Sequence, residues 1–565
     1  MATARAQSHR WPWGALAAPL LVLLAVGPTL SWLEFSGGSE SLLAATALEM
    51  RRDGSWLLPR LCGEKRIAKP PLPTWITAAA ISRDTLDRLD GPPGGWRDLA
   101  YSDLAVQMRL TALLAGCGML LGVYALGWAI GDRRLGLASS LVAASMLIFL
   151  MQARKATTDI HLALWVCAAN AFLAAAALRG RWWLGWTGAG IALGLAIMSK
   201  GPVALVQSVV PAATYIIARS FLAAAGPAVS ADDPSLRRFA APSLGLLLML
   251  LVALPWFAYV ALNTPDVIAR WRAEVTRVGA TDQPPGKWYA YISLFALVVP
   301  WTIFLLGGMW MAIQRIIARR IDGLALAMLL LVVPIVIMSL APDRKARYLL
   351  PMAGPAAVLS AAALLDLSDR WARRRRLDTL AVGVHWAMLA VLAAGLPIAG
   401  AAVLKTLEGR PWYTPWQAAC AAMVMLALLA LCWRVRPLDR SILRATVITM
   451  LLLHAVLVWG YRDTAEGRSE LKPLADTIVA RMPGAQVYSV WPNRPLRLAP
   501  PELPIYLNRI VRRSADVAAV PSPGDAPQAL LIRQRRNTPM PQPPGWAFVQ
   551  TAPQDDDWWH LFERE

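Results

Sequence analysis

The sequence predicts a polytopic α-helical membrane protein, and its composition and its long apolar runs both support this. Of the 565 residues, 57% are hydrophobic and only 16% are charged, whereas soluble proteins have about 25% charged residues. Many apolar runs are about 20 residues long, the length that a helix needs to cross about 30 Å of hydrocarbon. They lack the alternation of barrel strands, so we expect helices. A soluble enzyme, a disulfide-rich secreted protein and a disordered chain are excluded.

The length rule predicts about 13 membrane spans. We expect them near residues 14–33, 104–130, 135–151, 160–178, 184–198, 202–218, 241–262, 289–313, 322–340, 348–366, 380–404, 416–433 and 442–461. The first run follows two arginines but lacks a convincing small-residue cleavage site. We therefore interpret it as an uncleaved helix rather than a signal peptide.

Arginine is concentrated on every second predicted loop. The arginines are Arg133, Arg134, Arg179, Arg181, Arg219, Arg237, Arg238, Arg315, Arg319, Arg320, Arg370, Arg373 to Arg376, Arg434, Arg436, Arg440 and Arg444. Because basic residues collect on cytoplasmic loops, we expect a cytoplasmic N-terminus. With an odd number of spans, the C-terminus is then outside. This topology also explains the net charge of +20 without a nucleic-acid partner.

The chain divides into a transmembrane domain, residues 1–465, and a soluble extracytoplasmic domain, residues 466–565. The first outer loop, 34–103, begins with a helix of about Glu40 to Arg52, which we expect to lie on the membrane surface. The soluble domain is expected to be a small α/β unit. Its predicted elements are helices at Leu471–Met482 and near Pro504–Val511, and strands at Gln486–Trp491, Ala529–Arg533, Ala547–Thr551 and Trp558–Phe562.

Charged clusters at the predicted outer face are the candidate site. They are Ser39-Glu40, the run from Glu64 to Pro71 with Lys69, the run from Arg154 to His161 with Asp159, and the run from Asp343 to Pro351 with Lys345 and Arg347; Lys200 and Arg277 add to them. Cations can bind a lipid phosphate, and a carboxylate can deprotonate a nucleophile. Because nucleotide donors are not available outside the cytoplasm, this combination favours transfer from a polyprenyl-phosphate-linked sugar.

Simpler interpretations of these residues remain open. Asp159 and His161 could cap a helix. Lys345 and Arg347 could anchor a helix in lipid headgroups, and Lys69 could be an ordinary loop charge. The occurrence of all these clusters on one predicted face favours a common site.

Several ordered motifs resemble a known family. They are Asp53-Gly54-Ser55-Trp56, Pro59-Arg60-Leu61, Lys69-Pro70-Pro71-Leu72, Thr157-Thr158-Asp159-Ile160-His161-Leu162-Ala163, Ser199-Lys200-Gly201-Pro202-Val203 and Tyr348-Leu349-Leu350-Pro351. Over residues of about 14–365, the chain resembles bacterial glycosyltransferases related to the lipid A aminoarabinose transferase and to protein O-mannosyltransferases. This superfamily has the membrane GT-C fold.

The resemblance implies a multi-pass protein of the bacterial inner membrane that catalyses an inverting sugar transfer. The donor would be a polyprenyl-phosphate-linked sugar, and the acceptor a lipid A-like glycolipid, a polysaccharide or a protein. Asp159 matches the acidic position near the reaction centre, and Lys69 matches the lysine that binds lipid phosphate. Lys345 and Arg347 fall in the basic motif that would hold the same phosphate, and Lys200 lies in the Lys-Gly-Pro segment.

The sequence departs from the family at three positions. The usual Asp-Glu pair is Ser39-Glu40, the carboxylate before Lys69 is Ala68, and the usual Glu-His is Glu274-Val275. No cofactor is implied with certainty, because the usual ligands of a divalent metal are absent and only His161 remains as a weak candidate. We predict that Glu40 acts with Asp159 on the acceptor hydroxyl, with Glu34 and Glu274 in reserve.

Two other functions remain open. The chain could be a catalytically degenerate relative that binds polyprenyl lipid. It could also be a lipid flippase or transporter, but such proteins usually have inverted repeats and broken helices at mid-membrane. We find no internal repeat and few charges deep in the spans, which disfavours transport. Membrane lipids are expected partners in every case.

Overall fold

The computed structural model describes residues 13–35, 38–222, 235–276, 287, 289–402, 414–462, 471–492, 498–522, 524–554 and 557–564. In these ranges, nine helices are long and apolar enough to cross a membrane. They are α5 (Trp96–Ile130), α8 (Thr158–Arg179), α9 (Trp182–Lys200), α10 (Val203–Leu222), α11 (Ser235–Asn263), α16 (Ala353–Asp369) with the preceding 3₁₀ helix η4 (Ala346–Met352), α17 (Arg376–Ala402), α19 (Pro415–Trp433) and α20 (Leu438–Tyr461).

The expected count of 13 spans is not confirmed, although each expected run contains a described helix. Two runs are broken: α6 (Arg133–Ala144) meets α7 (Leu147–Ala153) at 66°, and the pair η3 (Ala290–Ser293) and α13 (Leu294–Leu297) meets α14 (Thr302–Ile317) at 110°. Counting each bent pair as one span gives up to 11 in the described part of the chain. The remaining two runs are shorter helices, α1 (Ala17–Val26) with its flanking 3₁₀ turns, and α15 (Gly323–Ser339).

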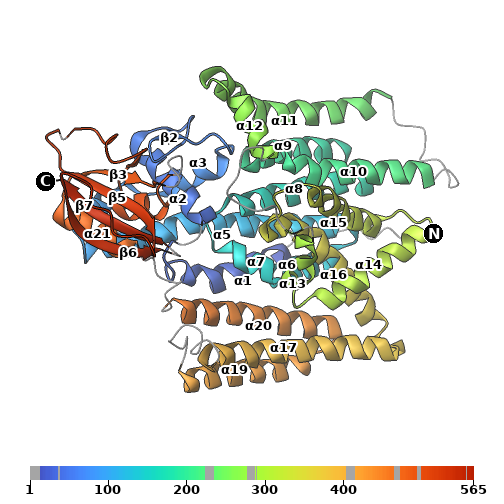
Figure 1. Ribbon diagram of the computed structural model, residues 1–565. Coiled ribbons are helices and arrows are strands. Elements are labelled where there is room, and N and C mark those ends of the chain that lie inside the picture. Colours follow the sequence, from blue (N-terminus) through green and yellow to red (C-terminus); the bar gives the residue numbers. More distant parts are fainter. Residues whose placement is uncertain are drawn as a thin grey trace.

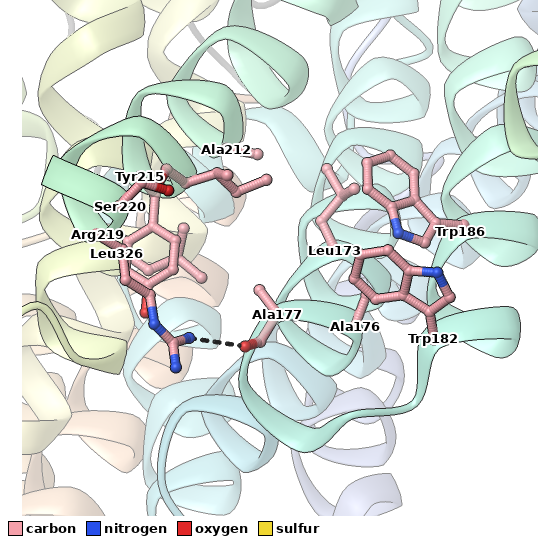
Figure 2. A pocket seen from close by; sticks show the side chains of 11 residues that line it. Leu173, Ala176, Ala177, Trp182, Trp186, Ala212, Tyr215, Arg219, Ser220 and Leu326 are labelled. Carbon is pink, nitrogen blue, oxygen red and sulfur yellow. Dashed lines mark hydrogen bonds between the residues drawn. The ribbon is translucent and has the colours of Figure 1, made fainter. Parts of the chain in front are cut away.

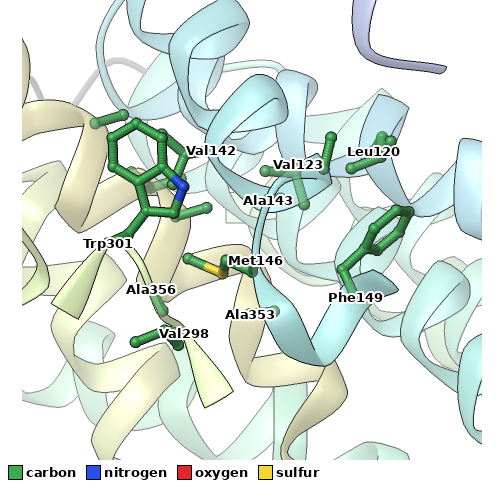
Figure 3. Close-up of a cluster of buried hydrophobic side chains, with 14 of the residues drawn as sticks. Leu120, Val123, Val142, Ala143, Met146, Phe149, Val298, Trp301, Ala353 and Ala356 are labelled. Atoms are coloured by element: carbon green, nitrogen blue, oxygen red, sulfur yellow. The ribbon is translucent and has the colours of Figure 1, made fainter. Parts of the chain in front are cut away.

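The two breaks lie against each other in the bundle core. Leu147 N–H donates to the Val299 carbonyl at 3.1 Å, and Trp301 Nε1 donates to Ser145 Oγ at 2.9 Å. Trp301 is fully buried, and Figure 3 shows it beside Val142 and Met146. Backbone groups freed by a break need partners inside a membrane protein. Here the broken segments provide partners for each other, which a length rule cannot detect.

The outer loop folds into a small layer of its own. It contains α2 (Gly38–Asp53), the hairpin β1 (Arg60–Leu61) and β2 (Glu64–Lys65), α3 (Leu72–Ala80) and α4 (Arg83–Leu89). A location of α2 at the membrane surface stays a prediction, but the helix does not expose one polar face, because most of it is buried. Leu43, Ala45, Leu48 and Met50 point in different directions around the helix, and all are at most 2% exposed. The helix is buried because other parts of the chain cover it.

The C-terminal part is a five-stranded sheet with two helices. Its elements are α21 (Lys472–Arg481), β3 (Gln486–Val490), α22 (Glu502–Leu507), β4 (Val511–Ser514), β5 (Gln528–Arg535), β6 (Trp546–Gln554) and β7 (Asp557–Arg564). The strand order is β4-β3-β5-β7-β6, with β3 parallel to β4 and β5, and β7 antiparallel to β5 and β6. The second helix ends earlier than predicted because Asn508 takes a left-handed conformation, and the following residues form β4 instead.

This sheet packs on the outer loop at one end of the helical bundle (Figure 1). The two regions share one apolar core, which includes Leu43 of α2, Leu104 of α5, Leu474 of α21 and Leu561 of β7. Arg97 of α5 is 1% exposed, and its Nη2 donates to the Tyr506 carbonyl at 2.6 Å. The C-terminal part therefore fixes the positions of α2 and of the start of α5.

Candidate active site

Asp159 and Lys200 meet because α8 and α9 form a helical hairpin. Asp159 lies in the first turn of α8, and Lys200 is the last residue of α9. A short turn at Gly180, which has a left-handed conformation, joins the two helices. The start of α8 consequently lies beside the end of α9. Lys200 Nζ forms an ion pair with Asp159 Oδ1, and the Asp159 side chain is only 4% exposed.

The basic motif reaches the same carboxylate from η4. Arg347 Nε lies 3.4 Å from Asp159 Oδ2. Lys200 Nζ lies 3.9 Å from the centre of the Tyr348 ring, so the lysine is held between a carboxylate and an aromatic face. The motif that contains Asp159, the Lys-Gly-Pro segment and the basic motif thus meet in space.

Asp343 and Lys345 extend this cluster. The Tyr348 hydroxyl donates to Asp343 Oδ2 at 2.7 Å, and Lys345 Nζ lies 3.7 Å from Asp343 Oδ1. A buried charge is tolerated only when it is paired and hydrogen-bonded. We use the name Asp159 cluster for Asp159, Lys200, Asp343, Lys345, Arg347 and Tyr348. Three cations around two carboxylates can exchange partners with an incoming phosphate.

Glu40 is engaged in a different interaction. It is 3% exposed, and both of its oxygens bind Arg109 of α5, at 2.8 Å to Nε and 3.0 Å to Nη2. Its Oε1 also accepts the Ala156 N–H at 3.1 Å. Burial alone would raise the pKa of Glu40, but the charge and hydrogen bonds of Arg109, with help from Arg154 and the Ala156 N–H, hold the pKa below its ordinary value. The carboxylate therefore stays ionised and paired.

Arg109 was missed by the sequence reasoning, although a signal was present. It is a cation inside the apolar run of α5, and ionisable residues inside spans are usually functional or paired. Besides Glu40, its Nη1 donates to the carbonyls of Leu30 and Leu33, both at 2.6 Å. The pair of Arg109 and Glu40 thereby ties the end of the first helical segment to Ala156, in the loop before α8.

Lys69 lies on a segment that packs beside the cluster. Ile67 is buried with Leu162 of α8 and Ile197 of α9, and its carbonyl accepts the Trp271 Nε1–H at 2.9 Å. These contacts hold the Lys69 segment near the start of α8 and the end of α9. Lys69 itself is half-buried.

Glu34, a reserve carboxylate, takes part in a different contact. Glu34 Oε2 accepts the Tyr506 hydroxyl at 3.3 Å, toward the C-terminal sheet. The Glu274 side chain and Arg277 lie outside the described residues. His161 is 2% exposed, and in the described ranges no group of three or more His, Cys, Asp or Glu side chains could hold a metal ion.

A separate apolar pocket lies toward the other end of α8. It has a volume of about 310 Å³. Figure 2 shows Tyr215 and Arg219 of α10 on one side and Trp182 and Trp186 of α9 on the other. No carboxylate lines this pocket, so it offers no general base. The Asp159 cluster is therefore a better candidate than this pocket for the site of a transfer reaction.

The fold is that of a multi-pass membrane protein, and its candidate site is a group of paired, buried charges at one end of the helical bundle. The chain is similar to membrane glycosyltransferases of this class. Residues 99–271 match the family model described as dolichyl-phosphate-mannose-protein mannosyltransferase.

Two curated relatives are undecaprenyl phosphate-α-4-amino-4-deoxy-L-arabinose arabinosyl transferases. The enzyme from Pseudomonas fluorescens is 26% identical over 377 residues, which are 64% of this chain and 60% of the relative. The enzyme from Sodalis glossinidius is 27% identical over 414 residues, which are 71% of this chain and 66% of the relative. The matched region thus spans a little under two thirds of the length of these relatives.

Solved structures of ArnT from Cupriavidus metallidurans share the fold over nearly the whole chain. The apo structure superposes with a TM-score of 0.71 at 18% identity and covers 97% of both chains. The structure bound to undecaprenyl phosphate gives the same score and covers 97% of this chain and 98% of ArnT. The resemblance to the GT-C superfamily, first recognised in the motifs, is confirmed.

Proposed function

We propose that this chain is an inverting glycosyltransferase that moves a sugar from a polyprenyl-phosphate-linked donor to an extracytoplasmic acceptor. The observation that carries the proposal is the Asp159 cluster, in which three separate sequence motifs meet around one buried carboxylate. The printed names of the relatives include undecaprenyl phosphate and arabinosyl transfer. An undecaprenyl-phosphate-linked sugar is therefore the donor that we propose for this chain.

The donor phosphate would bind the cations of the cluster. Lys345 is partly exposed and pairs with Asp343 at the long distance of 3.7 Å, so a phosphate can displace that partner at small cost. Arg347 can present its planar fork to two phosphate oxygens, and Lys200 acts as a point charge. Lys69 would complete the group from the adjacent segment.

Asp159 would act as the general base. In the proposed step, the acceptor hydroxyl gives its proton to the Asp159 carboxylate while its oxygen attacks the anomeric carbon. The bond between that carbon and the phosphate oxygen breaks, and the configuration of the sugar inverts. The lipid phosphate leaves with an additional negative charge, which the cations stabilise. A positioned carboxylate typically contributes about 10²–10⁴-fold to such a transfer.

Glu40 would serve as a positioning residue rather than as a second base. Its oxygens already bind Arg109 and the Ala156 N–H, three residues before Asp159. Asp159 is also paired, but its cations would turn to the donor phosphate, whereas Arg109 is held beside Glu40 by the Leu30 and Leu33 carbonyls. The acceptor class stays open among a lipid A-like glycolipid, a polysaccharide and a protein.

We also propose the orientation of the protein in the bacterial inner membrane. The arginine-rich loops would face the cytoplasm, as the positive-inside rule requires. The Asp159 cluster and the C-terminal sheet would then lie outside, where lipid-linked donors are presented.

The decisive experiment compares Asp159→Asn with the parent chain in two measurements. One is mass spectrometry of envelope glycolipids, polysaccharides and glycoproteins from cells with and without the chain. The other is binding of undecaprenyl phosphate to the purified protein. We expect transfer to fall at least 100-fold in Asp159→Asn while lipid binding changes little. Asp369→Asn, which alters an exposed carboxylate near the far end of α16, is the matched control.

Each result has a clear consequence. Undiminished transfer in Asp159→Asn would overturn the assignment of the base. A parent chain that binds the lipid but transfers no sugar to any acceptor would support the degenerate relative instead. Two observations support that alternative: Ser39 replaces the usual aspartate, and Glu40 is held in an ion pair with Arg109. A large gain of transfer in Ser39→Asp would also favour it.

A further inference from the structure

A long apolar groove lies between α5 and α8, with its mouth at the end of the bundle opposite Asp159. Its volume is about 870 Å³. The walls include Leu121, Ala125, Leu164, Ala168, Phe172 and Leu184. Helix α8 has 22 residues, and at 1.5 Å per residue its two ends lie about 33 Å apart. The mouth of the groove is therefore distinct from the Asp159 cluster.

Two arginines flank one tryptophan at the mouth of this groove. Arg133 lies 5.7 Å and Arg181 5.9 Å from the centre of the Trp128 ring. Both side chains are exposed, and neither forms an ion pair with another described residue. Guanidinium groups that converge on an apolar groove present hydrogen-bond donors that fit a phosphate.

The other charges at the mouth are already engaged. Arg179 donates from Nε to the Ala129 carbonyl at 3.0 Å and from Nη2 to the Trp128 carbonyl at 2.7 Å. Asp132 Oδ1 caps α6 by accepting the Leu135 N–H at 2.8 Å. The anion-binding capacity of the mouth consequently rests on Arg133 and Arg181.

We propose that this groove binds an anionic glycerophospholipid, with one acyl chain between α5 and α8 and the phosphate between Arg133 and Arg181. The lining of α5 runs from Gly118 to Ala129, which is about 17 Å of helix. One leaflet contributes about 15 Å of a hydrocarbon core of about 30 Å. The groove therefore has the depth of a single acyl chain, whereas a polyprenyl chain of many isoprene units is much longer.

The position of Trp128 agrees with this assignment. Tryptophan is enriched where a membrane protein meets the lipid headgroups, and basic pockets between helices bind anionic headgroups. The proposed lipid would cover the apolar walls and neutralise two neighbouring guanidinium groups. It would do so whether or not the chain transfers a sugar.

The test measures lipid binding rather than activity. The purified full-length chain is titrated with palmitoyl-oleoyl phosphatidylglycerol in mixed micelles, and bound lipid is counted by native mass spectrometry. Arg133→Gln combined with Arg181→Gln should weaken this binding at least tenfold. Arg319→Gln combined with Arg320→Gln is the matched control, since it removes two exposed charges from the loop before α15 without touching the groove.

Two further measurements separate the parts of the proposal. Ala168→Phe fills the groove but keeps both arginines, and it should also weaken phosphatidylglycerol binding. Phosphatidylcholine, which has no net charge, should bind the parent at least tenfold more weakly than phosphatidylglycerol. Equal binding of the two lipids, or unchanged phosphatidylglycerol binding in the double glutamine variant, would overturn the proposal.

Discussion

Asp159 is almost completely buried, and its carboxylate pairs with two cations from other helices. An isolated charge in such a position would be strongly destabilised. Lys200 and Arg347 offset that cost because they approach the two oxygens of the carboxylate separately. These two contacts hold the carboxylate in one position, which suits a group that must meet the hydroxyl of an acceptor.

The cations of the proposed phosphate site give the first prediction at this scale. The combination Lys69→Ala, Lys345→Ala and Arg347→Ala should weaken binding of undecaprenyl phosphate. Each cation that is lost removes a hydrogen bond to a charged group, worth roughly 1.5–3 kcal/mol. Isothermal titration with the lipid in detergent would measure the effect. Binding as tight as in the parent would exclude these three residues as the phosphate site.

The ion pair of Glu40 with Arg109 gives the second prediction. Glu40→Gln should destabilise the protein by about 3–5 kcal/mol at pH 7, because it leaves Arg109 buried without its anion. The exposed pair of Asp84 with Arg88 is the control, and Asp84→Asn should cost less than about 1 kcal/mol. Thermal unfolding in detergent would compare the two variants.

The pH dependence of this stability has a defined sign. The folded-state pKa of Glu40 lies below its ordinary value of 4.5. The ion pair therefore contributes fully above about pH 4.5, and its contribution is lost as the pH falls through the lowered folded-state pKa. The gap in stability between parent and Glu40→Gln should shrink in that acidic range. A gap that stays constant would show that the effect comes from shape rather than charge.

At the scale of elements, close helix contacts depend on glycines. On α9, a side chain at Gly190 would lie against the backbone of Gly245 on α11. On α14, a side chain at Gly308 would lie against the carbonyl of Leu359 on α16. Small residues allow helix backbones to approach closely in membranes, where van der Waals packing drives association. The contact at Gly190 fixes α9, and with it Lys200, relative to α11.

Gly190→Ala should therefore destabilise the protein by about 1–3 kcal/mol, the usual cost of overpacking. Gly383→Ala on α17 is the matched control, because no atom lies within 4 Å of the added methyl group. A fluorescence-based unfolding assay in detergent would report both midpoints. Equal midpoints for the two variants would contradict the close contact between α9 and α11.

At the scale of the whole molecule, the C-terminal sheet and the outer loop form one layer over the end of the bundle (Figure 1). Lys472 of α21 pairs with Asp98 of α5 at 3.0 Å, and Arg513 of β4 pairs with Glu64 of β2 at 2.7 Å. The tail and the loop must therefore lie on the same side of the membrane. The orientation of one determines the orientation of the other.

A topology reporter tests this orientation. Alkaline phosphatase fused after residue 565 should be active, because it folds only outside the cytoplasm. A fluorescent reporter that matures only in the cytoplasm, fused at the same position, should stay dark. The matched control is an insertion of each reporter between Arg319 and Arg320, in a predicted cytoplasmic loop, which should give the opposite pair of results. A bright fusion at residue 565 would reverse the proposed location of the Asp159 cluster.

Local sequence patterns were sufficient for much of the fold. Long apolar runs predicted the helices, and the predicted bounds of β3, β5, β6 and β7 differ from those in the structure by only a few residues. The strand β4 was missed because it has only four residues and follows directly after α22. That helix ends at Asn508, which has a left-handed conformation, and the sequence pattern did not predict this end. The bends in two spans were also missed, because the hydropathy of a run indicates its length but not whether the helix changes direction within it.

The candidate site was determined in part by the sequence alone. Asp159, Lys200, Lys345 and Arg347 could be selected because each lies in a motif with local charge and order. Their convergence, and the pairing of Glu40 with Arg109, required the tertiary structure, because residues 40, 109 and 156 are brought together only by packing. The sequence determines which charged residues lie in or near the apolar runs. A buried charge is stable only beside a partner, and these partners come from distant segments, so only the tertiary structure decides which charges pair.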